Sequence, residues 1–122
     1  MFFILTGTNL DAPDANALAD FYRRLLGWTV VVEDPGWVVL RPLGGGHTLN
    51  FQTESRYVRP VWPAGTGDPQ MMMHLEIRVD DLDAAVAQAV ALGATLAGFQ
   101  PQEDVRVCLD PAGHPFCLYT EA

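Results

Sequence analysis

The hydrophobic and polar positions of this chain follow the same course twice, since residues 8–52 and 75–119 align at an offset of 67. The matching positions are acids that open a helical pattern and Gly-His pairs that precede an alternating run: Asp14 and Asp81, Gly46-His47 and Gly113-His114. An internal repeat of this length indicates two copies of one supersecondary unit. We therefore predict two modules in one domain, residues 1–52 and 71–122, joined by a linker over residues 53–70.

Each module is predicted to contain a strand, a helix and three further strands. Short apolar or β-branched runs predict strands at 3–10, 28–33, 37–41 and 47–52, and again at 72–79, 95–99, 105–109 and 115–120. Apolar residues at helical spacing predict one helix from Asp14 to Gly27 and another over residues 81–92. An acid favours the first position of each helix and a glycine the last. The fold class is therefore α+β, with two βαβββ modules.

Composition and charge exclude several classes of partner. The 122 residues are 49% hydrophobic and 18% charged, which suits a globular domain with a core of its own. All 7 basic residues are arginine, against 15 acidic ones, so the net charge of −8 opposes binding to nucleic acid and to anionic membranes. Because no apolar run approaches the ~18 residues of a membrane span, and Met1–Leu5 lacks the basic residues of a signal peptide, we expect a cytoplasmic protein.

Strand alternation predicts which side chains face away from the helices. Between residues 73 and 79 the apolar positions should pack against a helix, which leaves His74, Glu76 and Arg78 on the other face. The same rule adds Asn50 and Gln52 from the first module and Cys117 and Tyr119 from the last strand. For the strand at 105–109 it places Arg106 and Cys108 with this polar set.

The polar set offers several kinds of chemistry. His74 beside Glu76 suits a general base oriented by a carboxylate, or simply a hydrogen-bonded histidine. Arg78 could form an ion pair with Glu76 or anchor a ligand carboxylate. The linker is either a lid or a packed crossover that merely joins the modules, and as a lid it would offer Trp62 and Tyr57 as contacts for a flat ligand.

Two cysteines lie symmetrically about the turn at Ala112-Gly113. A two-residue turn there would place Cys108 and Cys117 opposite each other on adjacent strands. A pair of buried free thiols, a reactive thiol and a disulfide are all compatible with that arrangement.

The repeat resembles the vicinal oxygen chelate superfamily, which contains glyoxalase I, bleomycin-resistance proteins and extradiol dioxygenases. The resemblance is carried by three motifs: Asp14 to Gly27 (DANALADFYRRLLG), His74 to Leu82 (HLEIRVDDL) and Asp110 to Phe116 (DPAGHPF). It implies that eight strands form a curved sheet, a half-barrel around a cleft, with the helices on its outer face. The chain resembles in particular the glyoxalase-like branch of this superfamily, which is common in bacteria.

The resemblance also implies four metal-ligand positions, here Gly7, Asn50, His74 and Cys117. Only His74 is a ligand of the usual type, so we expect no metal cofactor; one divalent ion held at His74 is the alternative. Loss of the ligand set favours a non-catalytic protein that binds a partly apolar or aromatic small molecule. The alternatives are a protein-interaction role and a lyase, isomerase or dioxygenase that uses a metal or a His74/Glu76 general base.

The predicted binding site gathers residues that are far apart in the sequence. Six side chains should line one pocket, with Trp62 or Tyr57 near its mouth and Arg78 as a further contact: Asn50, Gln52, His74, Glu76, Cys117 and Tyr119. The edges of two open sheets need covering, and members of the superfamily usually pair their modules within or between chains. We therefore also expect a homodimer.

Overall fold

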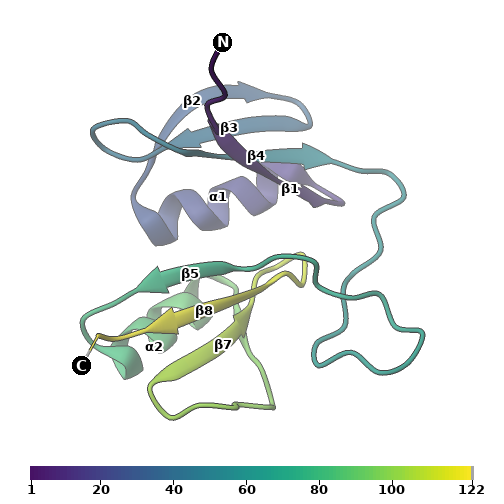
Figure 1. Ribbon diagram of the computed structural model, residues 1–122, viewed down its shortest axis with the longest axis vertical. Helices are drawn as coiled ribbons and strands as arrows, with labels where there is room; N and C mark the ends of the chain where they lie inside the picture. Colours follow the sequence, from purple (N-terminus) through teal and green to yellow (C-terminus); the bar gives the residue numbers. More distant parts are fainter. Residues whose placement is uncertain (122) are drawn as a thin grey trace. The chain divides into compact units, whose positions relative to one another are not determined.

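The computed structural model describes residues 1–121 and confirms the α+β class, with two helices and eight strands in two four-stranded sheets (Figure 1). The chain forms two compact units, of which the first spans Met1–Tyr57 and the second begins at Val58. Residues 54–74, which include most of the predicted linker, hold no helix or strand. Within the described residues, neither helix is long and apolar enough to cross a membrane.

The first unit is a four-stranded sheet packed against one helix. Its elements are β1 (Gly7–Ala12), α1 (Ala15–Leu26), β2 (Thr29–Asp34), β3 (Trp37–Arg41) and β4 (Thr48–Thr53), and the strand order is β1-β4-β3-β2 with β1 parallel to β4. The Asp14 carboxylate accepts a hydrogen bond from the backbone N–H of Ala17 at 3.1 Å, and Gly27 ends the helix with a φ of 71°. The predicted boundaries of this helix are thereby confirmed.

The core of the first unit lies between α1 and its sheet. The large side chains that α1 buries are Leu18, Phe21 and Tyr22. Phe21 meets Tyr22 edge to face at 4.9 Å between ring centroids, and Tyr22 stacks on Phe51 of β4 at 5.7 Å. Leu49 and Phe51 are buried, as alternation predicts, so Asn50 and Gln52 lie on the face away from the helix.

The second unit repeats this plan. Its elements are β5 (Leu75–Arg78), α2 (Leu82–Leu92), β6 (Thr95–Leu96), β7 (Val105–Leu109) and β8 (Pro115–Tyr119), in the order β5-β8-β7-β6. Asp81 caps α2 by accepting from the N–H of Ala84 at 3.1 Å, as predicted. The loop between β7 and β8 is organised by Asp110, which is 1% exposed and accepts two backbone N–H groups, from Ala112 at 2.9 Å and from His114 at 3.0 Å.

The first strand begins later than its apolar sequence predicts. Residues 3–10 were expected to form it, whereas β1 is Gly7–Ala12. A strand is defined by its partner, and β4 begins at Thr48, which lies opposite Gly7. Residues 1–5 have no strand beside them in the described part of the first unit.

The predicted faces of β7 are wrong. Cys108 lies opposite Phe116 and Arg106 opposite Leu118, and both partners are fully buried, so Cys108 and Arg106 project toward the packed face. Val107, not Cys108, lies opposite Cys117. The reason is the length of the Asp110–His114 loop, which has five residues and shifts the register by one from that of a two-residue turn. A shift of one residue exchanges the two faces of a strand.

Candidate ligand-binding site

The polar face of the second unit is formed by β5 and β8. Leu75 and Ile77 lie opposite the buried residues Phe116 and Leu118, whereas Glu76 lies opposite Cys117. Since paired residues of neighbouring strands share a face, Glu76 and Cys117 project away from the core. The alternation predicted for β5 is therefore confirmed.

Three side chains with chemically active groups converge on this face. The Nε2 atom of His74 and the Oε1 atom of Glu76 are 2.7 Å apart, a short hydrogen bond between the residue that precedes β5 and one within it. Cys117 joins them from β8, and the three groups each offer one donor atom, all within 4.8 Å of one another. The side chains of His74 and Glu76 are 35% and 54% exposed, so the cluster is open to solvent.

The environment keeps the Cys117 thiol protonated. Burial raises its pKa above the usual value, and the negative charge of Glu76 and a hydrogen bond to the Glu76 carboxylate raise it further. Glu76 thus accepts hydrogen bonds from both neighbours when the imidazole presents an N–H to it. Because its pKa is raised, the Cys117 thiol is a poor nucleophile.

The three residues of this cluster are chemically suited to a thiophilic metal ion, whereas the four positions implied by the resemblance contain only one ligand of the usual type, His74. Imidazole, carboxylate and thiolate are all zinc ligands, and catalytic zinc sites commonly use three protein ligands and leave a fourth position open. Binding an ion here requires that the Cys117 proton leave and that the His74–Glu76 hydrogen bond be exchanged for bonds to the metal. Glu76 lies outside the four positions implied by the resemblance, but strand alternation predicts it on the same face as the other two, and the structure brings the three together.

The first unit carries an amide version of this cluster. At the offset of 67 residues, Asn9 corresponds to Glu76 and Asn50 to Cys117, and Asn9 and Asn50 are likewise opposite each other on adjacent strands. The Nδ2 atom of Asn50 donates to Oδ1 of Asn9 at 2.8 Å, and the Asn50 Oδ1 atom accepts from the Thr48 hydroxyl at 2.9 Å. Asn9 was missed in the sequence, although the repeat offset pairs it with Glu76.

Gly7, at the position that corresponds to His74, has no room for a side chain. A Cβ atom there would collide with the Thr48 hydroxyl oxygen and lie 3.0 Å from the Asn50 amide nitrogen. The first unit therefore has no counterpart of the His74 imidazole. This polar face can donate and accept hydrogen bonds, but its amides cannot serve as acids or bases near neutral pH.

The other predicted site residues have partners of their own. Arg78 does not pair with Glu76; its guanidinium lies 3.3 Å from the Glu121 carboxylate, in an exposed ion pair beyond the end of β8. Tyr119 lies opposite Arg78 and is half-buried on the polar face. Trp62 packs against Phe99 at 5.8 Å between ring centroids.

Gln52 and Tyr57 belong to the first unit, where Gln52 is exposed next to Trp37 and the Tyr57 N–H donates to the Glu54 carbonyl at 3.1 Å. The predicted site residues are therefore divided between the two units. The single pocket expected from all of them stays a prediction.

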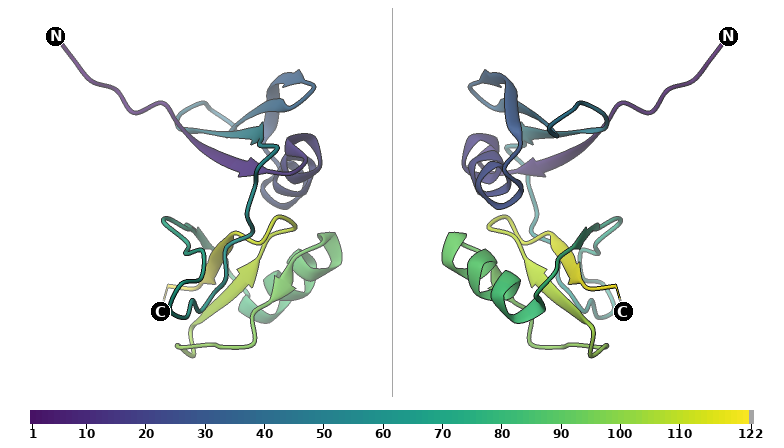
Figure 2. Two further views of the ribbon diagram at one scale, coloured as in Figure 1. Left: turned by 90° about the vertical axis from the view of Figure 1, so that its right-hand side faces the viewer. Right: turned by 90° about the vertical axis from the view of Figure 1, so that its left-hand side faces the viewer.

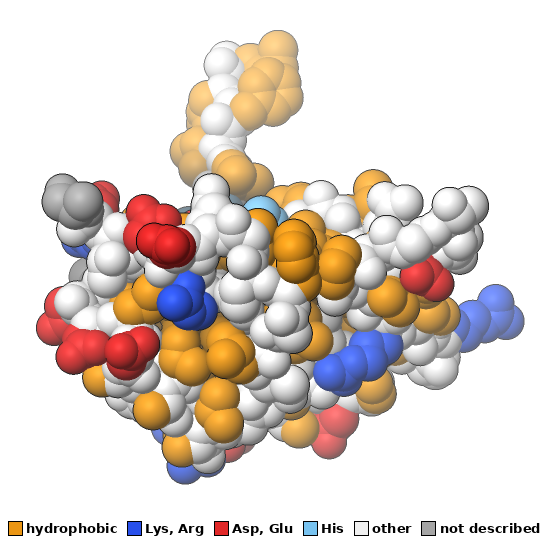
Figure 3. Space-filling view, turned by 90° about the horizontal axis from the view of Figure 1, so that it is seen from below, with side chains coloured by type: hydrophobic (Ala, Val, Ile, Leu, Met, Phe, Trp, Pro, Cys, Tyr) orange, Lys and Arg blue, Asp and Glu red, His pale blue; other side chains and the backbone are white. Residues whose placement is uncertain are grey.

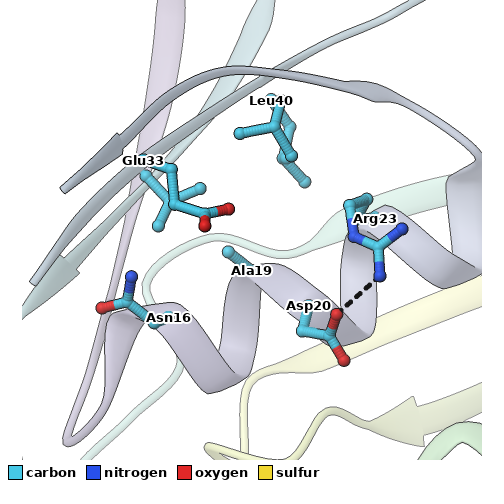
Figure 4. A pocket seen from close by; sticks show the side chains of 8 residues that line it. Asn16, Ala19, Asp20, Arg23, Glu33 and Leu40 are labelled. Carbon is cyan, nitrogen blue, oxygen red and sulfur yellow. Dashed lines mark hydrogen bonds and ion pairs between the residues drawn. The ribbon is translucent and has the colours of Figure 1, made fainter. Parts of the chain in front are cut away.

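A cavity of about 180 Å³ lies elsewhere, on the helix side of the first sheet (Figure 4). Its walls come from α1, β2 and β3: Asn16, Ala19, Asp20, Arg23, Val30, Glu33, Val38 and Leu40. An ion pair of 2.7 Å between Arg23 and Asp20 lies along its rim, and its floor residues Val38 and Leu40 are at most 2% exposed. It includes none of the predicted site residues, and it lies on the helix side of the first sheet rather than on the polar face.

Comparison with known proteins identifies relatives over nearly the whole chain. Residues 7–119 match the sequence profile of the glyoxalase-like domain. The anthracycline biosynthesis protein DnrV of Streptomyces peucetius is 30% identical over an alignment of 131 positions, which covers 91% of this chain but only 44% of DnrV. The chain thus spans less than half the length of that relative.

Solved structures share the fold. A glyoxalase/bleomycin resistance protein/dioxygenase family enzyme from Burkholderia phytofirmans PsJN is similar with a TM-score of 0.74 and 20% identity, over 97% of this chain and 98% of that one. TnmS3, an antibiotic-binding protein from Streptomyces sp. CB03234, gives a TM-score of 0.65 and 21% identity, over 99% and 98% of the two chains.

Proposed function

Because the chain belongs to the glyoxalase-like domain family, we propose that it binds a small, partly apolar or aromatic organic molecule without the metal usual in the resembling superfamily. The observation that carries this proposal is the convergence of His74, Glu76 and Cys117 on the helix-free face of the second unit. Polar groups gathered at one place on a sheet face give a ligand its orientation, while apolar surface supplies most of the binding free energy.

The chemistry of the cluster favours a ligand with hydroxyl or carbonyl groups. The imidazole of His74 is held by Glu76 through one nitrogen, so its other nitrogen is free to accept or donate a hydrogen bond. The neutral thiol of Cys117 adds a polarisable surface that carries no charge. The name of the relative DnrV and the description of TnmS3 as antibiotic-binding support an aromatic natural product as the ligand class. The remaining predicted contacts, Asn50, Gln52, Arg78, Tyr119, Trp62 and Tyr57, are candidates for the same role.

The test is a fluorescence titration of the protein with an anthracycline as probe. Replacing His74 by alanine should weaken binding by about tenfold, the effect of losing one hydrogen bond and its packing. His47→Ala is the matched control, because His47 is an exposed histidine with a single hydrogen-bond partner, the Thr8 hydroxyl at 2.7 Å. No binding of the probe, or equal losses in both variants, contradicts the proposal.

A second function, metal-dependent catalysis as a lyase, isomerase or dioxygenase, is favoured by one observation, the 4.8 Å grouping of three ligand types. A zinc ion held there would polarise an oxygen atom of a substrate. Without an ion, His74 oriented by Glu76 is suited to act as a general base.

Elemental analysis after dialysis against zinc distinguishes the two functions. The metal-dependent function requires one equivalent of zinc that is lost in Cys117→Ser and retained in Cys108→Ala, since Cys108 projects to the opposite face. Protein free of zinc supports the metal-free binder.

A further inference from the structure

The cavity between α1 and the first sheet is formed by one side of the helix and two paired strands. Along α1 its wall residues recur at intervals of three or four, which places them on one side of the helix: Asn16, Ala19, Asp20 and Arg23. On the sheet side, Val30 of β2 lies opposite Leu40 of β3. Glu33 of β2 lies opposite Val38 in the same way. Figure 2 shows α1 lying along one face of this sheet, so the cavity belongs entirely to the first unit.

A β-bulge in β2 turns Glu33 toward this cavity. In a regular strand, residues three positions apart project to opposite faces, so Val30 and Glu33 would not share one. The pairing of β2 with β3 skips one residue between Val30 and Val32, and this extra residue places Glu33 on the helix side. Val31 and Val32 are left 39% and 36% exposed. The strand thus exposes two valines and directs a carboxylate toward the helix, and bulges that redirect a side chain in this way are frequent beside functional sites.

The Glu33 carboxylate has no partner of its own within the described residues. Residues 1–121 give it neither an ion pair nor a side-chain hydrogen bond, and in Figure 4 it points from β2 toward α1, above Ala19. Arg23, which lines the same cavity, is engaged with Asp20 on its own helix at 2.7 Å. With two carboxylates against one guanidinium, the walls carry an unbalanced negative charge.

The cavity combines this charge with an apolar floor. Val38 and Leu40 are 2% and 0% exposed and Ala19 is 3% exposed, whereas Glu33 and Asp20 are open to solvent. An apolar void of roughly 150 Å³ accommodates a benzene ring, so about 180 Å³ has room for such a ring and one small group. Drug-sized ligands need about 300–1,000 Å³, which limits this cavity to smaller molecules.

We propose that the cavity binds a small organic cation, an ammonium group on an apolar body of about six carbon atoms. The ammonium group pairs with the Glu33 carboxylate, and the apolar body lies over Val38 and Leu40. The net charge of −8 favours a cation over an anion, and on the face drawn in Figure 3 the arginines stand apart rather than forming a basic patch. The site shares no residue with the cluster of His74, Glu76 and Cys117, so it stands or falls independently of the function proposed above.

The experiment is a titration of the full chain with benzylamine at pH 7, followed by the backbone amide resonances in NMR spectra. Resonances of α1, β2 and β3 should shift with a Kd on the order of 1 mM, because a ligand of so few atoms binds weakly. Benzyl alcohol, which has the same ring without the charge, should bind about fivefold more weakly. Benzoate, which has the opposite charge, should bind more weakly still.

Three variants test the assignment of the ammonium site. Glu33→Gln should weaken the binding of benzylamine about fivefold and leave that of benzyl alcohol unchanged. Asp34→Asn is the matched control, because Asp34 is the next residue of β2 and lies opposite Trp37, which pairs with Gln52 on the face away from α1. It removes the same charge and should weaken binding by less than about twofold, since solvent and salt screen it. Ala19→Leu places a larger side chain in the cavity and should abolish the binding of both probes.

Circular dichroism melting shows whether each variant folds. If Ala19→Leu does not fold, the comparison of Glu33→Gln with Asp34→Asn decides alone. The absence of shifts around the cavity in the wild type overturns the proposal, as do equal losses in Glu33→Gln and Asp34→Asn. Benzoate that binds as tightly as benzylamine, or full binding by a folded Ala19→Leu, likewise overturns it.

Discussion

Replacing Phe21 by alanine should remove a large part of the stability of the first unit. Phe21 is 3% exposed on the inner face of α1, and its ring meets that of Tyr22 edge to face. Phenylalanine-to-alanine changes in a core cost about 3–5 kcal/mol, which includes the cavity and the lost aromatic contact. Since domains of this size are stable by only about 5–15 kcal/mol, the free energy of unfolding should fall by about a fifth at least, and by all of it if the unit is only marginally stable.

Urea denaturation and calorimetry measure this effect. At about 4 °C of melting temperature per kcal/mol for a chain of this length, the first unit should melt about 12–20 °C lower. Phe99→Ala is the matched control in the second unit, because Phe99 is 54% exposed and its ring lies beside that of Trp62; it should cost below about 1.5 kcal/mol. If Phe21→Ala costs no more than Phe99→Ala, the assignment of Phe21 to the core is refuted.

Three further outcomes follow from the second unit. Asp110→Ala should lower the free energy of unfolding by about 2–3 kcal/mol in urea titrations, because the buried N–H of Ala112 and the partly buried N–H of His114 lose their acceptor; a change within error contradicts this. Glu76→Gln should lower the pKa of Cys117 and speed its alkylation by iodoacetamide, as peptide mass spectrometry would detect, and an unchanged rate argues against the Glu76–thiol contact. Burial, with a smaller contribution from Cys117, raises the pKa of Cys108 from 9.0 to about 11, so this thiol should stabilise the fold below pH 9, and its contribution should be lost as the pH rises to about 11. The share of the pH dependence that Cys108 contributes should disappear in Cys108→Ala, while the raised pKa of Cys117 leaves a remainder; an unchanged pH dependence refutes the assignment.

The features predicted correctly from the sequence are those set by local geometry. Asp14 and Asp81 cap their helices and Gly27 ends the first one, because a capping bond or a positive φ involves only a few neighbouring residues. Which side chains of β4 and β5 face the core was predicted correctly, because side chains of a strand alternate with a period of two and this period can be read from the sequence. The repeat offset also holds at the level of contacts, since Asn9–Asn50 and Glu76–Cys117 are equivalent strand pairs.

The features decided only by the tertiary structure depend on which strands pair and in what register. The five-residue loop around Asp110 shifted β7 by one position, which turned Cys108 to the core side and put Val107 beside Cys117. Arg78 forms an ion pair with Glu121, a residue that the sequence gives no reason to place near it.

The candidate site itself depends on both kinds of information. The alternation of β5 directs Glu76 away from the core. The parallel pairing of β5 with β8 places Cys117, 41 positions further along the chain, directly opposite Glu76. Where β1 begins was likewise set by its partner β4, and this left the apolar residues Met1–Leu5 outside the sheet. Periodicity is a property of a few consecutive residues and can be read from the chain, whereas register is a property of two distant segments and of the loop that joins them.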